Sequence, residues 1–418
     1  MARYLYGGKD GISDEALSAA VTEWAAGYPE AQKILVIPPD YTRFHSMAGR
    51  ITNILYHFFA GRQVDILPAL GSHAPVTEAE AAAMFGDVPY DRFLVHDWRH
   101  DVIRIGTVPA DFVREASEGV MDKEIEVEAN HLLFDGGYDL IVSVGQVVPH
   151  EVVGMANYSK NIFVGCGGSR MINASHKLGA YYGLERIMGL DHSPVRQVFD
   201  YAEEHFLRDG PLHYILTVTT GQGMVPTMHG LFIDGGREGF EKAVALSQEK
   251  NLNHVAEPFK KCVVLLDEKE FKTTWLGNKA VYRTRKAMAD GGELLILAPG
   301  VTHFGEDPEI DGLIRKYGYK GRERTIALAA ENEDLQHNMS AAAHLIHGSS
   351  DGRFTITYAA RRLTREEVEG VGYRYADYDA MAARYMTPET KDGPNITADG
   401  EEYYFISNPA LGLWTYTP

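Results

Sequence analysis

The chain has 418 residues, 45% of them hydrophobic, which is enough for an extensive core and exceeds the usual size of one domain. Its 40 Lys+Arg against 58 Asp+Glu give a net charge of −18, which excludes a basic surface for nucleic acid or an anionic membrane. Two cysteines, Cys166 and Cys262, exclude a disulfide framework and lack zinc-site spacing. With neither an apolar signal core nor a run of about 18 apolar residues, a cytoplasmic location is expected.

The first half of the chain alternates predicted strands and helices. The β-branched run at 33–37 predicts a parallel strand buried on both faces. Ser46–Phe59 has helical apolar spacing, and Thr77 with Glu80 predicts a second helix that starts with a capping box. Further strands are expected at 64–70, 93–96 and 140–144, with short antiparallel edges at 103–105 and 124–127.

The second half repeats this alternation. Strands are expected at 261–267, 293–298, 324–328 and 354–358, with a helical stretch around 278–289. The fold class is therefore α/β, with two α/β domains, mainly parallel sheets and a cleft between them. We expect domains at 1–255 and 256–394, a hinge in the hydrophilic stretch 247–258, and a tail, about 395–418, that packs back on the first domain.

Polar residues follow several predicted strands of the first half. Asp40, Thr42 and Arg43 follow the first strand, His73 follows the second, and His150 follows the strand at 140–144. Carboxyl ends of parallel strands are where α/β enzymes build their sites. Taken singly, each residue also fits a structural reading, as a helix cap or a histidine bonded to the backbone.

His150 begins a set of residues with distinct chemistry. Lys160 follows ten residues later and His176 a further sixteen. The set combines a proton-transfer base, an amine that can form a covalent bond, and a metal ligand.

This order and spacing, with the Asp-Tyr-Thr-Arg loop and His73 before it, resembles the lactate racemase family, whose enzymes use a nickel-pincer nucleotide. The resemblance implies that Lys160 anchors this cofactor covalently and that His176 completes nickel coordination. It also implies that cofactor-synthesis enzymes are partners and that His73 and His150 handle substrate protons. The expected protein is a racemase or epimerase that inverts C2 of a 2-hydroxy acid by hydride transfer.

The chemistry of that reaction gives each residue a role. Two bases with pKa values near neutrality are needed on opposite faces of the substrate, and histidine supplies them. No side chain accepts hydride, and no GxGxxG follows a first strand, so a cofactor other than a dinucleotide is expected. Arg43 fits the substrate carboxylate by a bidentate hydrogen bond, and the resemblance implies that Lys279 is a second carboxylate-binding cation. Asp40, Thr42, Ser159 and Trp275 are assigned to the cofactor.

The chain departs from the family's commonest form. Asn157-Tyr158-Ser159 stands where a Ser-Gly-Gly turn is usual, Trp275 replaces a tyrosine, and Leu276 replaces a glutamine. Extra hydrogen-bonding groups favour a longer hydroxy acid or sugar acid over lactate as the substrate.

Two other functions fit parts of the pattern. His73, His150 and His176 together resemble a three-histidine zinc site of a hydrolase. A non-catalytic protein that binds a sugar acid is the other alternative.

Overall fold

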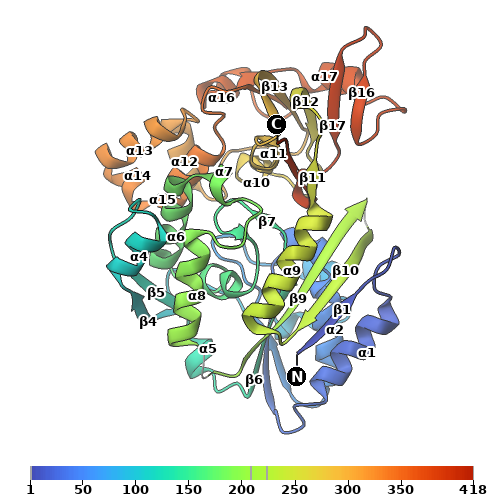
Figure 1. Ribbon diagram of the computed structural model, residues 1–418, viewed down its shortest axis with the longest axis vertical. Helices are drawn as coiled ribbons and strands as arrows, with labels where there is room; N and C mark the ends of the chain where they lie inside the picture. The colour runs from blue at the N-terminus through green and yellow to red at the C-terminus, as the bar shows by residue number, and fades with distance from the viewer. Residues whose placement is uncertain (1, 208–209, 223–224, 418) are drawn as a thin grey trace. The chain divides into compact units, whose positions relative to one another are not determined.

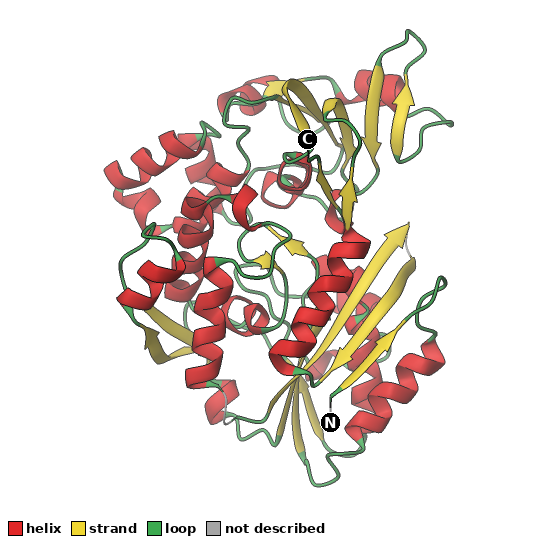
Figure 2. Cartoon of the chain, viewed as in Figure 1, coloured by secondary structure: helices red, strands yellow, loops and turns green. Residues whose placement is uncertain are grey.

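The computed structural model describes residues 2–207, 210–222 and 225–417, and the chain divides into two compact units (Figure 1). The first unit comprises Met1–Leu178 and Arg186–Asn251, and the second comprises Gly179–Glu185 and Leu252–Pro418. Each unit has a mainly parallel sheet accompanied by helices, which confirms the predicted fold class of two α/β domains (Figure 2).

The main sheet of the first unit has the strand order β1-β10-β9-β6-β2-β3. Strands β3, β2, β6 and β9 are parallel, and β10 and β1 extend the sheet in antiparallel fashion. The central strands are apolar and fully covered, as the β-branched run at 33–37 predicts. The bounds are β1 Arg3–Tyr6, β2 Lys33–Ile37, β3 Gln63–Ile66, β6 Leu140–Gln146, β9 Leu212–Gln222 and β10 Val225–Ile233.

Helices cover both faces of this sheet. Helices α1 (Asp14–Ala25), α2 (Ala48–Phe58) and α3 (Glu78–Phe85) share one hydrophobic core with the strands, whereas α9 (Gly236–Asn251) packs against β9 and β10. The predicted start of α3 is confirmed, because Thr77 and Glu80 form a reciprocal capping box.

The remaining elements of the first unit lie between the sheet strands in sequence. Strands β4 and β5 form the predicted antiparallel pair, and β7 pairs with β8. Short helical turns follow the main strands at η1 and η3. The bounds are η1 Tyr41–Ser46, η2 Tyr90–Arg92, β4 Val102–Val108, α4 Ala110–Ala116, β5 Ile125–Asn130, α5 Leu132–Asp135, β7 Pro149–His150, β8 Gly154–Met155, η3 Asn161–Gly165 and α8 Pro194–Phe206. Helices α6 (Ser169–Tyr182) and α7 (Leu184–Ile187) are divided between the two units.

The second unit has its own sheet, with the order β15-β14-β13-β12-β17-β16. All neighbouring strands are parallel except β16 and β17, and β11 pairs separately with β18. The strands are β11 Leu252–His254, β12 Phe259–Leu265, β13 Met288–Ala298, β14 Thr355–Ala360, β15 Arg374–Tyr375, β16 Gly393–Ile396, β17 Glu402–Ile406 and β18 Leu413–Thr415. The helices are α10 Thr274–Gly277, α11 Lys279–Thr284, α12 Pro308–Tyr317, α13 Arg322–Glu331, α14 Glu333–His337, α15 Met339–His347, α16 Arg365–Gly370, α17 Tyr378–Tyr385 and η4 Pro409–Leu411.

Three local predictions were wrong. The segment 324–328 is not a strand but part of α13, where alanine and leucine favour a helix. The segment 93–96 forms a single bridge, between Phe93 and Ile66. The tail does not return to the first unit, because β17 pairs with β12 and buries Tyr403 and Phe405 in the second unit's core.

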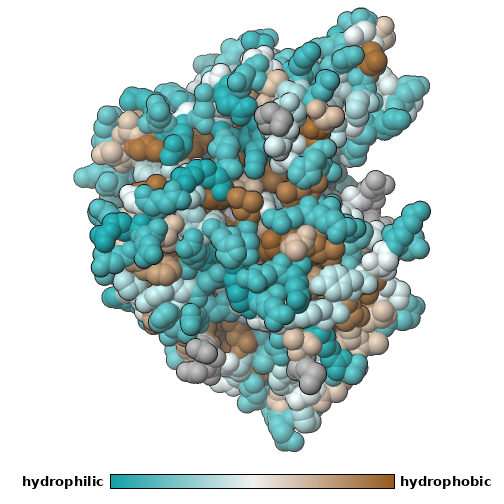
Figure 3. Space-filling view, viewed as in Figure 1, coloured by the Kyte–Doolittle hydropathy of each residue, from teal (hydrophilic) through white to brown (hydrophobic). Residues whose placement is uncertain are grey.

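The surface agrees with the composition. Hydrophilic side chains cover most of the face drawn in Figure 3. Within the described residues, no helix is both long and apolar enough to cross a membrane. Cys166 and Cys262 are buried free thiols, and burial raises both pKa values, that of Cys166 to about 12.

Candidate active site

The polar loops predicted from the sequence lie at the carboxyl ends of neighbouring strands. β2 lies between β3 and β6, so the loops after these three parallel strands leave the same edge of the sheet. The chain passes from β2 to β3 on one side and later returns to β6 on the other side of β2, which makes this edge a topological switch point, where open α/β sheets bind ligands. The loops carry Asp40 and Arg43, His73, and the segment from His150 to Lys160.

Asp40 fixes the orientation of His73. The Asp40 carboxylate caps η1 by accepting hydrogen bonds from the Thr42 backbone N–H at 2.9 Å and the Thr42 hydroxyl at 2.5 Å. Its other oxygen lies 2.5 Å from Nδ1 of His73. Burial opposes ionisation of Asp40, but His73, Thr42 and Arg43 outweigh it and hold the pKa of this carboxyl below its usual value. An ionised Asp40 accepts a hydrogen bond from Nδ1–H of His73. In neutral His73 the free lone pair is therefore on Nε2.

His150 is buried at the end of β7 and has the opposite arrangement. Its Nδ1 accepts a hydrogen bond from the Val152 backbone N–H at 3.1 Å. A neutral imidazole whose Nδ1 accepts must carry its proton on Nε2. Glu151 lies beside it, with a carboxylate oxygen 3.9 Å from Nδ1 of His150. His73 and His150 therefore present an acceptor and a donor, respectively, at Nε2.

Lys160 follows a turn with unusual backbone geometry. Asn157 has φ 64° and Tyr158 has φ 56°, both in the left-handed region that disfavours residues with a Cβ. Directly after Lys160, Asn161–Gly165 forms a π-helical turn, a feature frequent at functional sites. The Asn161 side-chain amide donates to the backbone carbonyl of Ile37 at 3.1 Å and so ties this turn to the end of β2.

The electrostatic environment of Lys160 favours a reactive amine. Burial, and then the nearby Arg43 cation, lower the pKa of Lys160 to about 8, although Glu151 and Asp40 act in the opposite direction. At neutral pH, the unprotonated fraction is therefore far larger than for an exposed lysine. An unprotonated amine is the nucleophile that covalent attachment needs.

His176 has the properties of a metal ligand. It lies on α6, where its Nδ1 donates to the backbone carbonyl of Ile172 at 2.7 Å. Burial and then the charge of Lys160 lower the pKa of His176 to about 4, so the ring is neutral at neutral pH. With Nδ1 held by a carbonyl, Nε2 offers its lone pair, as in most metal-bound histidines. A neutral imidazole suits nickel, so the side chains present here fit that ion.

The three histidines are not arranged to share one metal ion. Within residues 2–207, 210–222 and 225–417, the group whose ligand atoms all lie within 4.8 Å of one another is Asp191, His192 and Glu241. Two of these three are exposed, and Asp191 forms an ion pair with Arg237. The zinc-hydrolase alternative therefore receives no support from the geometry.

Residues 14–184 match the model of the lactate racemase N-terminal domain. Over this part, the chain is similar to the lactate racemase family. No curated protein sequence gives a significant match.

Two solved structures share the fold along nearly the whole chain. A Thermotoga maritima protein is 23% identical with a TM-score of 0.83, covering 99% of this chain and 100% of its own. The lactate racemase apoprotein from Thermoanaerobacterium thermosaccharolyticum is 17% identical with a TM-score of 0.69, covering 97% of this chain and 93% of its own. The racemase-like fold therefore extends through the second unit.

The sequence analysis missed two residues of the candidate site. Glu151 acts on the charges of both Lys160 and His176. In the sequence, only its position next to His150 could have indicated that Glu151 belongs to the candidate site. Arg196, which is fully buried on α8, contacts the turn before Lys160 and has no sequence motif that marks it.

The remaining predicted residues are in the second unit. Trp275 stacks on His344 with ring centroids 4.6 Å apart, and Lys279 is buried with its amine 5.6 Å from the centre of the Phe271 ring. Their contribution to the site stays a prediction.

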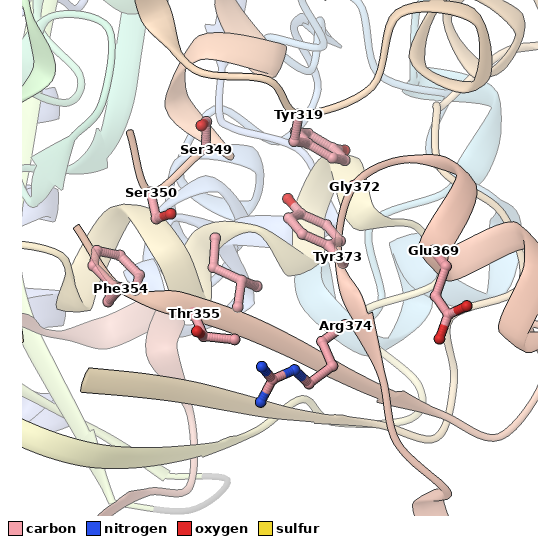
Figure 4. Close-up of a pocket in the computed structure, with 10 residues that line it drawn as sticks. Tyr319, Ser349, Ser350, Phe354, Thr355, Glu369, Gly372, Tyr373 and Arg374 are labelled. Carbon is pink, nitrogen blue, oxygen red and sulfur yellow. The ribbon is translucent and has the colours of Figure 1, made fainter. Parts of the chain in front are cut away.

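The second unit also contains a cavity of about 420 Å³. It lies near the amino ends of β14 and β15, beside the stacked rings of Tyr319 and Tyr373, and Thr355 and Arg374 contribute to its wall (Figure 4). None of its lining residues is one that the sequence predicted for the site.

Proposed function

We propose that this chain is a racemase or epimerase that inverts C2 of a 2-hydroxy acid with a nickel-pincer nucleotide. Lys160 would hold the cofactor covalently and His176 would bind its nickel. When bound, the cofactor supplies the hydride acceptor that side chains cannot provide. The observation that carries the proposal is the pairing of His73 and His150, one an acceptor and one a donor at Nε2, in the loops that also present Lys160.

The two histidines suit proton transfer on either side of C2. Nε2 of His73 takes the hydroxyl proton of one enantiomer, and the ionised Asp40 stabilises the resulting imidazolium. Nε2–H of His150 donates a proton to the oxygen of the 2-keto form as the other enantiomer is made, and the proton held by His73 then passes to His150, so that both rings end neutral. The reverse reaction exchanges these roles, as microscopic reversibility requires.

Substrate binding rests on a local cation in a strongly acidic protein. Arg43 lies close enough to Asp40 and Lys160 to change both their pKa values, which supports its assignment to this site. A guanidinium binds a carboxylate with two parallel hydrogen bonds. Lys279 remains the proposed second cation.

We further propose a longer hydroxy acid or sugar acid as substrate. Tyr158 packs against Tyr214 and Phe240, and the Ser159 hydroxyl bonds Arg196, so these two residues shape the turn more than they offer donors to a ligand. The Glu151 carboxylate would instead supply the hydrogen-bond acceptor for the substrate's additional hydroxyls. A carboxylate beside the reacting carbon accepts hydrogen bonds from additional hydroxyls and repels a second carboxylate, which favours an aldonic acid over a dicarboxylic acid.

The deciding experiment measures exchange of C2 configuration by NMR for lactate and for a sugar acid. The protein is produced with and without the cofactor-making enzymes, and intact mass and nickel content are measured on each sample. We expect turnover, a covalent adduct and nickel only in the first preparation, with faster turnover of the sugar acid. Turnover without an adduct would refute the cofactor assignment, and faster turnover of lactate would refute the substrate assignment.

Variants locate the cofactor. Lys160→Ala should abolish the adduct, and His176→Ala should lower nickel occupancy while the fold is retained. Lys123→Ala, at an exposed lysine of the same unit, is the matched control and should change neither. Zinc in the active protein would support the hydrolase alternative, and the absence of any turnover or adduct would support a binding protein.

A further inference from the structure

The turn that carries Lys160 is held by a buried arginine from a distant helix. Arg196 lies on α8 and is fully buried. One terminal nitrogen donates to the Ser159 hydroxyl at 2.6 Å, and the other donates to the carbonyl oxygens of Met155 at 2.8 Å and Asn157 at 3.1 Å. Both ends of the guanidinium thus contact the segment that leads directly into Lys160.

The same turn is the part of the site with the least favourable backbone. Asn157 and Tyr158 both adopt positive φ without being glycine. Such residues relax toward negative φ unless their surroundings hold them. Removal of the contacts that hold this turn would therefore move the backbone that carries Lys160.

Several other contacts also hold the turn. The Tyr158 ring packs between Tyr214, at 4.5 Å, and Phe240, at 5.1 Å. The Arg196 guanidinium lies 4.4 Å from the centre of the Phe240 ring, and the Ser159 hydroxyl lies 3.4 Å from a carboxylate oxygen of Asp200. Helices α8 and α9 thus hold the turn by packing and charge, and Arg196 links them to its carbonyl groups.

We propose that Arg196 is a positioning residue that holds the Asn157–Tyr158 turn in its left-handed form and so aligns Lys160 for cofactor attachment. The inference rests on the proposed function for its catalytic consequence, and its structural consequence can be measured in the protein without cofactor. Arg196 contacts the turn and not the substrate-binding Arg43, so its loss should affect turnover more than substrate binding.

The test compares Arg196→Met with Arg237→Met. Arg237 also lies beside Phe240, at 5.3 Å, and pairs with Asp191 and Asp200, but the structure gives it no bond to residues 155–160. Hydrogen–deuterium exchange is measured for the amides of the turn, where Ala156 donates to Val148 and Asn161 donates to Tyr158. Kinetic constants for C2 exchange are measured on protein loaded with cofactor.

For Arg196→Met we expect amide exchange in the turn to accelerate about tenfold, with the rest of the unit unchanged. We expect kcat to fall about 10²-fold, because displacement of a reacting group by about 1 Å has that effect. KM should stay within about twofold. Arg237→Met should leave the exchange of the turn and kcat as in the wild-type protein.

A rescue separates positioning from general support of the fold. Glycine adopts positive φ without strain, so Arg196→Met/Asn157→Gly should recover at least about tenfold in kcat over the single variant. Ser159→Ala removes the acceptor of one Arg196 hydrogen bond and should give a smaller loss in the same direction. If Arg196→Met fails to fold, Ser159→Ala replaces it in this test.

Equal exchange of the turn in the two arginine variants, or no recovery with glycine, would overturn the inference. So would unchanged turn exchange and turnover in Ser159→Ala. If the wild-type protein shows no C2 exchange at all, the proposed function fails, whereas the exchange data still decide the role of Arg196.

Discussion

Replacement of Lys160 by methionine should make the protein without cofactor more stable at neutral pH. The pKa of Lys160 is about 8 against the usual 10.5. At 1.36 kcal/mol per pKa unit, the charged amine is disfavoured in the folded state by about 3 kcal/mol. This value is an upper bound, since Lys160 keeps part of its contact with solvent. Methionine has a similar length and carries no charge, so it removes this unfavourable contribution.

The sign of the pH dependence follows from the lowered pKa. Below about pH 8, Lys160 is protonated in both states, and the unfavourable contribution is complete. Between about pH 8 and 10.5, the unfolded chain keeps a proton that the folded protein has lost, so the stability of the wild-type protein rises with pH. The advantage of Lys160→Met should therefore be greatest near pH 7 and disappear by about pH 10.5.

Thermal unfolding of the protein without cofactor, at several pH values, measures this effect. A gain of 3 kcal/mol corresponds to an increase in Tm of about 5–10 °C for a unit of this size. Lys123→Met, at an exposed position, is the control and should not change Tm. A gain that is the same at pH 7 and pH 10, or a loss of stability at pH 7, would refute the electrostatic reasoning.

Three further outcomes are expected. Asp40→Asn should lower turnover about 10²-fold, because an amide cannot stabilise the His73 imidazolium, and unchanged kcat would contradict the assigned pair. Burial and then Asp200 raise the pKa of Glu203 from 4.5 to about 7, so this group makes stability fall as pH rises from about 4.5 to 7. Glu203→Gln should remove that part of the Tm profile. Gly145→Ala should destabilise by about 1–3 kcal/mol, because its Cβ would lie 1.9 Å from the Asn157 amide, whereas Gly8→Ala, with open space around it, should have little effect on Tm.

The fold was predictable where local pattern and tertiary environment agree. The β-branched run of β2 and the capping box at Thr77 each specify one structure, and both were predicted. The segment 324–328 was not, since its alternation of Thr, Ile, Ala and Leu also satisfies a helix. The tail strand β17 was placed on the wrong unit because strand pairing depends on a partner, β12, that lies far away in sequence.

In the candidate site, too, the residues that were predictable are those marked by local sequence. Asp40, His73 and His150 could be assigned to the candidate site because strand ends are visible in the sequence, and parallel pairing brings those ends to one edge. Arg196 was not found, because its role exists only once α8 packs on the turn before Lys160. A buried arginine has no spacing rule relative to the loop that it contacts.

The unfavourable features of the first unit gather at one edge of its sheet. A partly buried amine with a lowered pKa, a buried carboxylate and a left-handed turn without glycine all follow the ends of β2 and β6, whereas the strands themselves are regular and apolar. A turn with only a structural role would gain from glycine at 157, and a core position would gain from an apolar side chain at 160. The chain has neither a glycine at 157 nor an apolar side chain at 160. Strain and buried charge that persist against simple improvements mark a site selected for chemistry, and Lys160 is the residue at which both meet.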